Sequence, residues 1–204
     1  FEAKCPITIA GLPGNVSLEC GYLAVPLNRR DAESPLISLA VAILRPDTAR
    51  YADPIIYLAG GPGENALETL YLSAGKLILP ALSSGRDLIV LDQRGMGLSQ
   101  PALDCPDMVT VAAALLDREL DGKTLSDTDI ANLMMAGGAQ CHDLLAAQTD
   151  LSMFNTDAIA ADVEDLRKAL RYKEWNLWGV SYGTRLALEI LRDHPAGVRS
   201  AVLD

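Results

Sequence analysis

The sequence predicts an α/β fold with a mostly parallel sheet and helices on both faces, and three observations support this prediction. Short apolar segments alternate with helical patterns in the second half of the chain, and this alternation favours parallel strands. A glycine-rich loop containing Gly60 directly follows one apolar segment. A glycine-flanked serine, Ser181, stands between another apolar segment and a helical pattern.

The first half of the chain is expected to form four strands and one helix. The four apolar segments bounded by turn residues are 22–27, 37–44, 54–58 and 87–91. A turn at residues 28–31 joins the first two strands and makes that pair antiparallel. A helical pattern covers about 65–82. The longest apolar stretch, at about 36–44, is far too short to span a bilayer.

Residues 101–155 differ in character from the rest, and we expect a helical insertion there. Ser126 and Asp129 match the pattern of a capping box at a helix start. Beyond this stretch the alternation becomes regular. It predicts helix, strand, helix and strand at residues 157–172, 176–180, 184–192 and 198–203.

Composition limits the possible functions. The chain has 204 residues, of which 50% are hydrophobic, and this suits one globular domain with a sizeable core. The net charge of −10 argues against a nucleic-acid partner, because phosphate binding needs a basic surface. Two histidines are too few to form a convincing zinc site with the cysteines, and we expect no metal or other cofactor.

The four cysteines, Cys5, Cys20, Cys105 and Cys141, permit three ways of forming two disulfides. We favour Cys5 with Cys20 and Cys105 with Cys141, because these pairings close two local loops. The alternative is four reduced, buried thiols. Disulfides would indicate an oxidising compartment, so we expect a secreted or periplasmic protein.

Ser181 is the candidate nucleophile, within the segment Gly179-Val180-Ser181-Tyr182-Gly183. A serine hydroxyl is a weak nucleophile and must be presented to a base. A sharp strand-to-helix turn presents it, and the flanking glycines are needed because the strained backbone leaves no room for a Cβ. A chance match is the alternative, but the expected strand before the motif and helix after it argue against chance.

The segment Gly60-Gly61-Pro62-Gly63 is the candidate oxyanion loop. Acyl transfer builds negative charge on the carbonyl oxygen, which backbone N–H groups must stabilise. We expect Gly61 to supply one N–H, since Pro62 has none, and Tyr182 to supply the other. Alone, this glycine-rich segment could be an ordinary turn.

The segment DQRGMGLS at residues 92–99 also follows a predicted strand. It lacks the glycine and lysine spacing of a phosphate-binding loop. We expect a tight turn near the site, held by Asp92 and Arg94, rather than a direct part in catalysis.

Together these motifs resemble the proline iminopeptidase and tripeptidyl aminopeptidase branch of the α/β-hydrolases, over about residues 20–204. The resemblance implies an α/β-hydrolase fold, with residues 1–204 as the N-terminal part of the domain. It implies a serine nucleophile, an oxyanion loop at the GGPG segment, and peptide substrates with free amino termini. Many relatives have histidine before that loop, where this chain has Ala59.

The catalytic acid and base are not evident in this sequence. The triad runs serine, acid, histidine along the chain, and the sequence ends at Asp204, after the strand that follows the elbow helix. His194 and His142 are expected to be structural, and Asp204 fits a turn better than a catalytic acid. We therefore expect a truncated or split hydrolase, whose acid and histidine come from a C-terminal remainder or a second chain.

The favoured function is an exported aminopeptidase that acts through an acyl-enzyme at Ser181. One alternative is a carboxylesterase or lipase that acts on small esters. The other is a hydrolase-like binding or assembly module without catalysis.

Overall fold

The computed structural model describes residues 5–9, 12–47, 51–72, 81–105, 107–120 and 122–204. The chain divides into two compact units. The first comprises Phe1–Ala102 with Met153–Asp204, and the second comprises Leu103–Ser152. Within the described ranges, no helix combines the length and the apolar character needed to cross a membrane.

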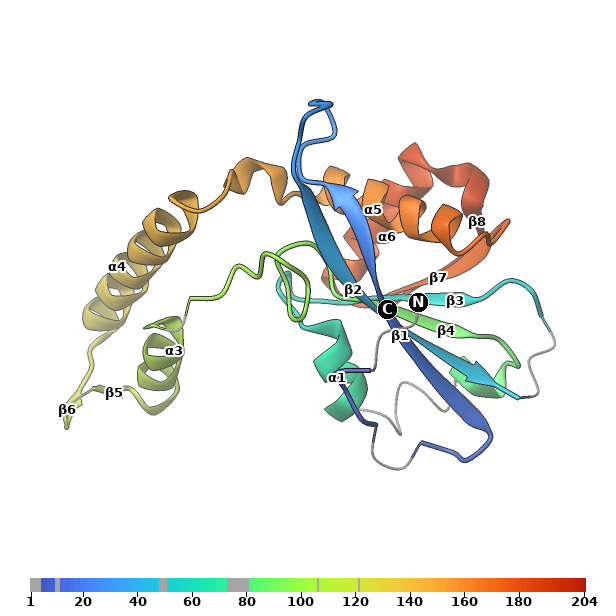
Figure 1. Ribbon diagram of the computed structural model, residues 1–204. Helices are drawn as coiled ribbons and strands as arrows, with labels where there is room; N and C mark the ends of the chain where they lie inside the picture. Colours follow the sequence, from blue (N-terminus) through green and yellow to red (C-terminus); the bar gives the residue numbers. More distant parts are fainter. Residues whose placement is uncertain (1–4, 10–11, 48–50, 73–80, 106, 121) are drawn as a thin grey trace. The chain divides into compact units, whose positions relative to one another are not determined.

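The first unit is built on a six-stranded sheet with the order β1-β2-β4-β3-β7-β8 (Figure 1). The strands are β1 (Val16–Pro26), β2 (Leu36–Pro46), β3 (Ile55–Leu58), β4 (Leu88–Leu91), β7 (Trp175–Gly179) and β8 (Val198–Leu203). Strands β4, β3, β7 and β8 run parallel, whereas β1 pairs antiparallel with β2 and β2 antiparallel with β4. The predicted mostly parallel sheet with an antiparallel start is therefore confirmed.

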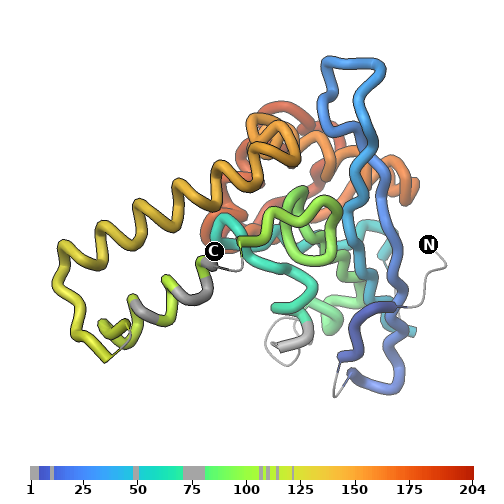
Figure 2. Tube along the Cα trace, turned by 60° about the vertical axis from the view of Figure 1, so that its left-hand side comes forward, coloured from blue at the N-terminus to red at the C-terminus, as the bar shows by residue number. Residues whose placement is uncertain are grey.

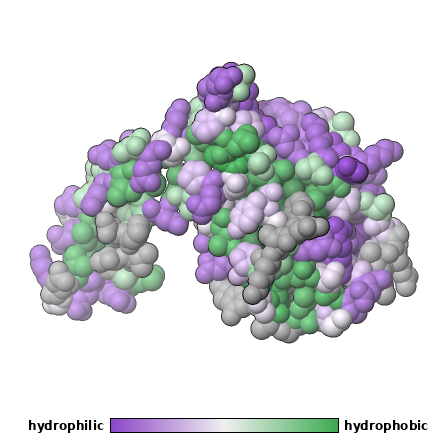
Figure 3. All heavy atoms as spheres, viewed as in Figure 1, coloured by the Kyte–Doolittle hydropathy of each residue, from purple (hydrophilic) through white to green (hydrophobic). Residues whose placement is uncertain are grey.

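Strand β1 begins six residues earlier than the sequence pattern indicates. It pairs with β2 without a break from Val16 opposite Pro46 to Pro26 opposite Leu36. The ladder with β2 therefore extends β1 over residues that the sequence pattern did not assign to a strand. The predicted turn at residues 28–31 is present, where the Asp31 N–H donates to the Asn28 carbonyl at 3.2 Å. Its surface is largely hydrophilic, at the top of Figure 3.

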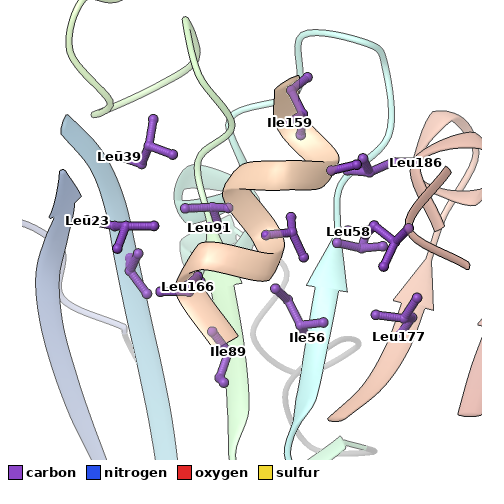
Figure 4. Close-up of a cluster of buried hydrophobic side chains, with 14 of the residues drawn as sticks. Leu23, Leu39, Ile56, Leu58, Ile89, Leu91, Ile159, Leu166, Leu177 and Leu186 are labelled. Atoms are coloured by element: carbon purple, nitrogen blue, oxygen red, sulfur yellow. The ribbon is translucent and has the colours of Figure 1, made fainter. Parts of the chain in front are cut away.

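Helices cover both faces of this sheet, as predicted. Helices α5 (Thr156–Ala169) and α6 (Tyr182–Asp193) pack on one face, where Ile159, Val163 and Leu166 of α5 are buried against the strands (Figure 4). These three positions are the apolar stripe that the sequence indicates. Helix α1 (Ala66–Leu72) packs on the other face through Leu67 and Leu70.

Strand β2 shows how both faces of the sheet are filled. Its side chains alternate between the two faces. Leu39, Val41 and Ile43 join the cluster under α5 and α6, whereas Ala40, Ala42 and Leu44 join the cluster under α1. Burial on both faces explains why this strand has a continuous apolar sequence.

The helix predicted at about 65–82 is described only in part. Helix α1 accounts for its start and residues 81–83 are helical, but residues 73–80 lie outside the described part of the chain. The described part of this unit also contains two 3-10 turns, η1 (Leu151–Met153), which begins in the second unit, and η2 (Pro195–Gly197).

The second unit is a helical hairpin (Figure 2). Helix α3 (Asp107–Asp117) and helix α4 (Asp127–Ala146) are joined through a short ladder of β5 (Glu119–Leu120) and β6 (Lys123–Thr124). The predicted capping box begins α4: Ser126 accepts from the Asp129 N–H at 3.2 Å and the Asp129 carboxylate accepts from the Ser126 N–H at 3.0 Å. The helices predicted in this stretch are confirmed.

Both favoured disulfide pairings are present. Cys5 bonds to Cys20 with a Cα–Cα distance of 5.0 Å, and Cys105 bonds to Cys141 with a Cα–Cα distance of 5.6 Å. The first ties the N-terminal segment to β1, and the second ties the start of the helical hairpin to α4. The four cysteines are all paired.

Candidate active site

Ser181 stands in the turn between β7 and α6, and its side chain is exposed. Its backbone has φ 52° and ψ −117°, which is a strained conformation for a residue with a Cβ. Two hydrogen bonds to the ends of the neighbouring strands β3 and β8 hold this turn in place. The Val180 N–H donates to the Leu58 carbonyl at 3.2 Å, and the Ser181 N–H donates to the Asp204 carbonyl at 2.8 Å.

Steric contacts explain the two glycines that flank this turn. A Cβ on Gly183 would stand 1.9 Å from the Leu58 carbonyl oxygen, and a Cβ on Gly179 would stand 2.5 Å from the Gly183 carbonyl oxygen. The first glycine of α6 is thus pressed against the end of β3. Only this close approach allows the strand-to-helix turn to be sharp enough to expose Ser181.

The loop at residues 60–63 lies directly against Ser181. A Cβ on Gly60 would stand 3.3 Å from the Ser181 Cβ and 3.0 Å from the Glu64 Oε2. Gly61 and Gly63 have φ values of 98° and 104°, which only glycine adopts without strain. The structure therefore brings together the two segments that the sequence places 120 residues apart.

The two expected oxyanion donors lie at suitable places, although their role stays a prediction. Tyr182 is the first residue of α6, where an N–H has no intrahelical carbonyl to bind and lies at the positive end of the helix dipole. Gly61 is exposed in the loop. The neighbouring Gly60 N–H is already used, because it donates to the Glu64 carboxylate at 2.8 Å.

The Tyr182 side chain is anchored to a second helix. Its hydroxyl lies 2.8 Å from the Thr156 Oγ1, in the first turn of α5. This hydrogen bond ties the start of the elbow helix to the start of α5. Sequence reasoning identified Tyr182 but not Thr156, since the pairing depends on how the two helices pack.

Asp92 is a buried residue that directly follows β4 and hydrogen-bonds to the start of α1. Its carboxylate accepts the Leu67 N–H at 2.9 Å and the Leu98 N–H at 2.8 Å. A Cβ on Gly97 would clash with this carboxylate. Burial raises the pKa of Asp92, and this effect outweighs the backbone N–H hydrogen bonds, which lower it. The DQRGMGLS segment is thus a turn closed on Asp92, and it fixes the start of α1, the helix that follows the glycine-rich loop.

Arg94 is fully buried and forms a bidentate ion pair with Asp162 of α5. Its Nε and Nη2 each lie 2.7 Å from an Asp162 oxygen. Its Nη1 also donates to the carbonyls of Leu27, at 3.0 Å, and Met153, at 2.8 Å. The guanidinium therefore joins the turn after β4 to the end of β1, to η1 and to α5. Asp162 was not identified from the sequence, although an acidic residue between the apolar positions of α5 could have indicated a buried partner for Arg94.

Replacing Arg94 by methionine is expected to lower the free energy of unfolding by about 3 kcal/mol, because Asp162 loses its bidentate partner while remaining buried. A urea denaturation curve, monitored by circular dichroism, measures this change in the free energy of unfolding. The matched control is Arg29→Met. Arg29 also binds Asp162, at 2.5 Å, but its side chain is 28% exposed, so we expect a loss of about 1 kcal/mol or less. An equal loss of unfolding free energy in the two variants would contradict the conclusion that Arg94 is the main partner of the buried Asp162.

The histidines and Asp204 lie as follows. His194 is the C-cap of α6, whose N-cap is Ser181, so it stands about 20 Å from Ser181 along the helix. His142 is exposed on α4, with its Nδ1 3.1 Å from the Asp143 Oδ1. Asp204 follows β8, and its N–H donates to the Gly179 carbonyl at 2.9 Å. His194 is therefore not placed to activate Ser181.

A comparison with protein families identifies the class of this fold. The family described as the alpha/beta hydrolase fold matches residues 53–204, which include the glycine-rich loop at residues 60–63, the DQRGMGLS turn and the elbow. The chain therefore belongs to the α/β-hydrolase fold family.

Several curated proteins are similar to this chain. They include the serine protease Hip1 of Mycobacterium tuberculosis, 27% identical over 185 residues, and a tripeptidyl aminopeptidase of Streptomyces lividans, 28% identical over 190 residues. A probable proline iminopeptidase of Streptomyces coelicolor is 28% identical over 153 residues. The alignments cover 91%, 92% and 75% of this chain, but 35%, 35% and 32% of the relatives. The chain thus spans about a third of their length.

Solved structures show the same fold. A proline iminopeptidase-related protein of Thermus thermophilus matches with a TM-score of 0.51 and 23% identity, over 92% of this chain and 44% of that protein. The proline iminopeptidase of Mycobacterium smegmatis matches with a TM-score of 0.51 and 18% identity, over 89% of this chain and 42% of that protein. The fold and the expected family resemblance are therefore confirmed.

Proposed function

We propose that this chain carries the nucleophile of a serine hydrolase of the peptidase class, with Ser181 as the attacking residue. The observation that supports this most strongly is the strained, exposed elbow at Ser181, with Gly60 of the glycine-rich loop packed against its Cβ. An α/β-hydrolase uses a turn of this kind to present a nucleophile at the carboxyl edge of the sheet.

In the proposed reaction the Ser181 hydroxyl attacks the carbonyl carbon of the substrate. Its proton passes to a histidine base, and the negative charge on the carbonyl oxygen is stabilised by the N–H groups of Gly61 and Tyr182. The amine leaves with the proton from the histidine, and an acyl-enzyme remains on Ser181. Water then attacks the acyl carbon and gives a proton to the histidine. The bond between the acyl carbon and the Ser181 oxygen breaks, that oxygen takes the proton from the histidine, and the product carboxylic acid is released.

The histidine base, and the aspartate or glutamate that orients it, are proposed to come from a C-terminal remainder of the protein or from a second chain. The support is the position of His194 at the far end of α6. The relatives are also about three times as long as the aligned region, which leaves ample sequence for both residues.

The proposed substrates are peptides with a free amino terminus, and the proposed location is outside the cytoplasm. Relatives named as a tripeptidyl aminopeptidase and as a probable proline iminopeptidase support the first point. The two disulfides support a secreted or periplasmic location, because such bonds persist in oxidising compartments.

The test of this proposal is labelling of the full-length protein with a fluorophosphonate, which reacts with an activated serine. Peptide mapping should place the label on Ser181. Faster turnover of aminoacyl amides than of short acyl esters would support a peptidase, whereas turnover of esters alone would identify a carboxylesterase. No labelling at any pH would overturn the proposal and favour a binding module.

A further inference from the structure

Tyr182, the residue that carries one of the proposed oxyanion N–H groups, directly follows the strained elbow. Among the residues that the structure describes, no carbonyl accepts its N–H, so this group can meet a substrate oxygen. A backbone N–H stabilises an oxyanion only when it is already held about 3 Å from the place where the charge develops. The φ of 52° at Ser181 makes this harder, because a strained backbone keeps its shape only where its surroundings impose it.

The sheet holds the backbone on one side of Tyr182. The Val180 N–H donates to the Leu58 carbonyl at 3.2 Å, and this residue and Ser181 both precede Tyr182 in the chain. On the other side, the backbone of Gly183 lies against Leu58. That steric contact prevents α6 from moving closer to β3, but it does not prevent movement away. A further attachment is therefore needed to fix the start of α6.

A hydrogen bond between two hydroxyl groups supplies this attachment. The Tyr182 hydroxyl lies 2.8 Å from the Thr156 Oγ1, and both side chains are half-buried. In the part of the chain that the structure describes, this is the one hydrogen bond that Tyr182 makes outside its own helix. The ring joins the hydroxyl to the backbone as a rigid arm with only two rotatable bonds. Fixing its tip therefore restricts where the Tyr182 N–H can lie.

Thr156 is a suitable anchor because the start of α5 is itself held in place. Its N-cap residue is Asn155, whose side chain accepts the Ala158 N–H at 2.9 Å. Further along α5, Asp162 forms the buried bidentate ion pair with Arg94. The position of Thr156 is thus set by the helix cap and by a buried salt bridge.

Packing between the two helices does not require this pair of hydroxyls. Val163 of α5 and Leu186 of α6 already belong to one apolar cluster. Valine and phenylalanine in place of Thr156 and Tyr182 would fill the same space without polar atoms. A hydrogen bond adds only a modest net stability, but it fixes a direction, which apolar contact does not. The hydroxyl pair therefore suits a role in orientation.

We propose that Thr156 is a positioning residue, whose hydroxyl holds the Tyr182 side chain so that the Tyr182 N–H points at the oxyanion. This inference rests on the proposed function and adds a residue that touches neither the substrate nor the reacting atoms. The N–H bond to the carbonyl oxygen strengthens as negative charge develops on that oxygen. A misdirected N–H therefore weakens the transition state more than it weakens substrate binding.

The principal variant is Thr156→Val, which keeps the shape of the side chain and removes its hydroxyl. In the full-length protein, kcat and kcat/KM should both fall about fivefold, with KM changed less than about twofold. The substrate is the best of a panel of aminoacyl 4-nitroanilides and short 4-nitrophenyl esters. Thr156→Ser keeps a hydroxyl and should restore at least about half of the wild-type kcat. The control is Thr128→Val, the same change at an exposed position in the first turn of α4, which should leave both constants unchanged.

Tyr182→Phe tests the other end of the same hydrogen bond, because it removes the hydroxyl and keeps the backbone N–H. It should lower kcat by a similar factor. Since both substitutions delete one and the same bond, the double variant with Thr156→Val should be no slower than the slower single variant. A urea unfolding curve of each variant checks that the protein is folded in the assay.

Three results would overturn the inference while the proposed function stands. They are an unchanged kcat in a Thr156→Val protein that is still labelled at Ser181, a Thr156→Ser protein as slow as Thr156→Val, and a double variant in which the two losses multiply. A wild-type protein that no fluorophosphonate labels at Ser181 would instead overturn the proposed function, and the inference with it.

Discussion

Replacing Ser181 by alanine is expected to abolish fluorophosphonate labelling and to lower kcat at least about 10⁴-fold in the full-length protein. The reason is that the proposed acyl-enzyme cannot form without the hydroxyl, whereas substrate binding and the proposed oxyanion N–H groups are unaffected. The fold should be preserved, because alanine and serine both carry a Cβ at the φ of 52° that the elbow requires. Intact-mass measurement after labelling and initial rates on aminoacyl amides check this result.

The control for this variant is Ser200→Ala, which removes a hydroxyl from β8, the strand beside the elbow strand. Ser200 donates to the Asn176 side chain at 2.6 Å and has no part in the proposed reaction, so its labelling and rates should match the wild type. Full labelling of Ser181→Ala would show that another residue is the nucleophile.

The strand-to-helix turn at Ser181 could be predicted from sequence because the signal for it is local. The elbow needs a strand, a glycine-flanked serine and a helix in succession, and all of them lie within about twenty residues of sequence. The same holds for α5, whose Ile159, Val163 and Leu166 have helical spacing. The start of β1 could not be predicted, because its first residues are held in a strand only by their partners on β2.

The supporting contacts of the site depend on packing and therefore escaped sequence reasoning. The Asp162 partner of Arg94 lies 68 residues further along the chain, and Thr156 reaches Tyr182 only because α5 and α6 lie side by side on the sheet. Glu64 is different, since it is four residues from Gly60. An acidic side chain at that spacing after a glycine turn is a local signal that could have been used.

The largest effect on stability is expected from Gly183→Ala. The new Cβ would stand 1.9 Å from the Leu58 carbonyl oxygen, 2.7 Å from the Leu58 carbonyl carbon and 3.0 Å from the Ala59 carbonyl oxygen. All three atoms belong to the backbone at the end of β3, so no side-chain rotation can relieve the contact. The Leu58 carbonyl also accepts the Val180 N–H at 3.2 Å, and a shift of α6 would strain that bond.

We therefore expect Gly183→Ala to lower the free energy of unfolding by more than about 4 kcal/mol, beyond the range of most single substitutions. Thermal and urea unfolding measure the loss. The same change at Gly138 of α4 is the control, because nothing lies within 4 Å of its added Cβ and alanine is favoured over glycine in a helix by about 1 kcal/mol. A Gly183→Ala protein as stable as the wild type would show that α6 can move away from β3. The fold would then not require the tight elbow, and the assignment of Ser181 as nucleophile depends on that elbow.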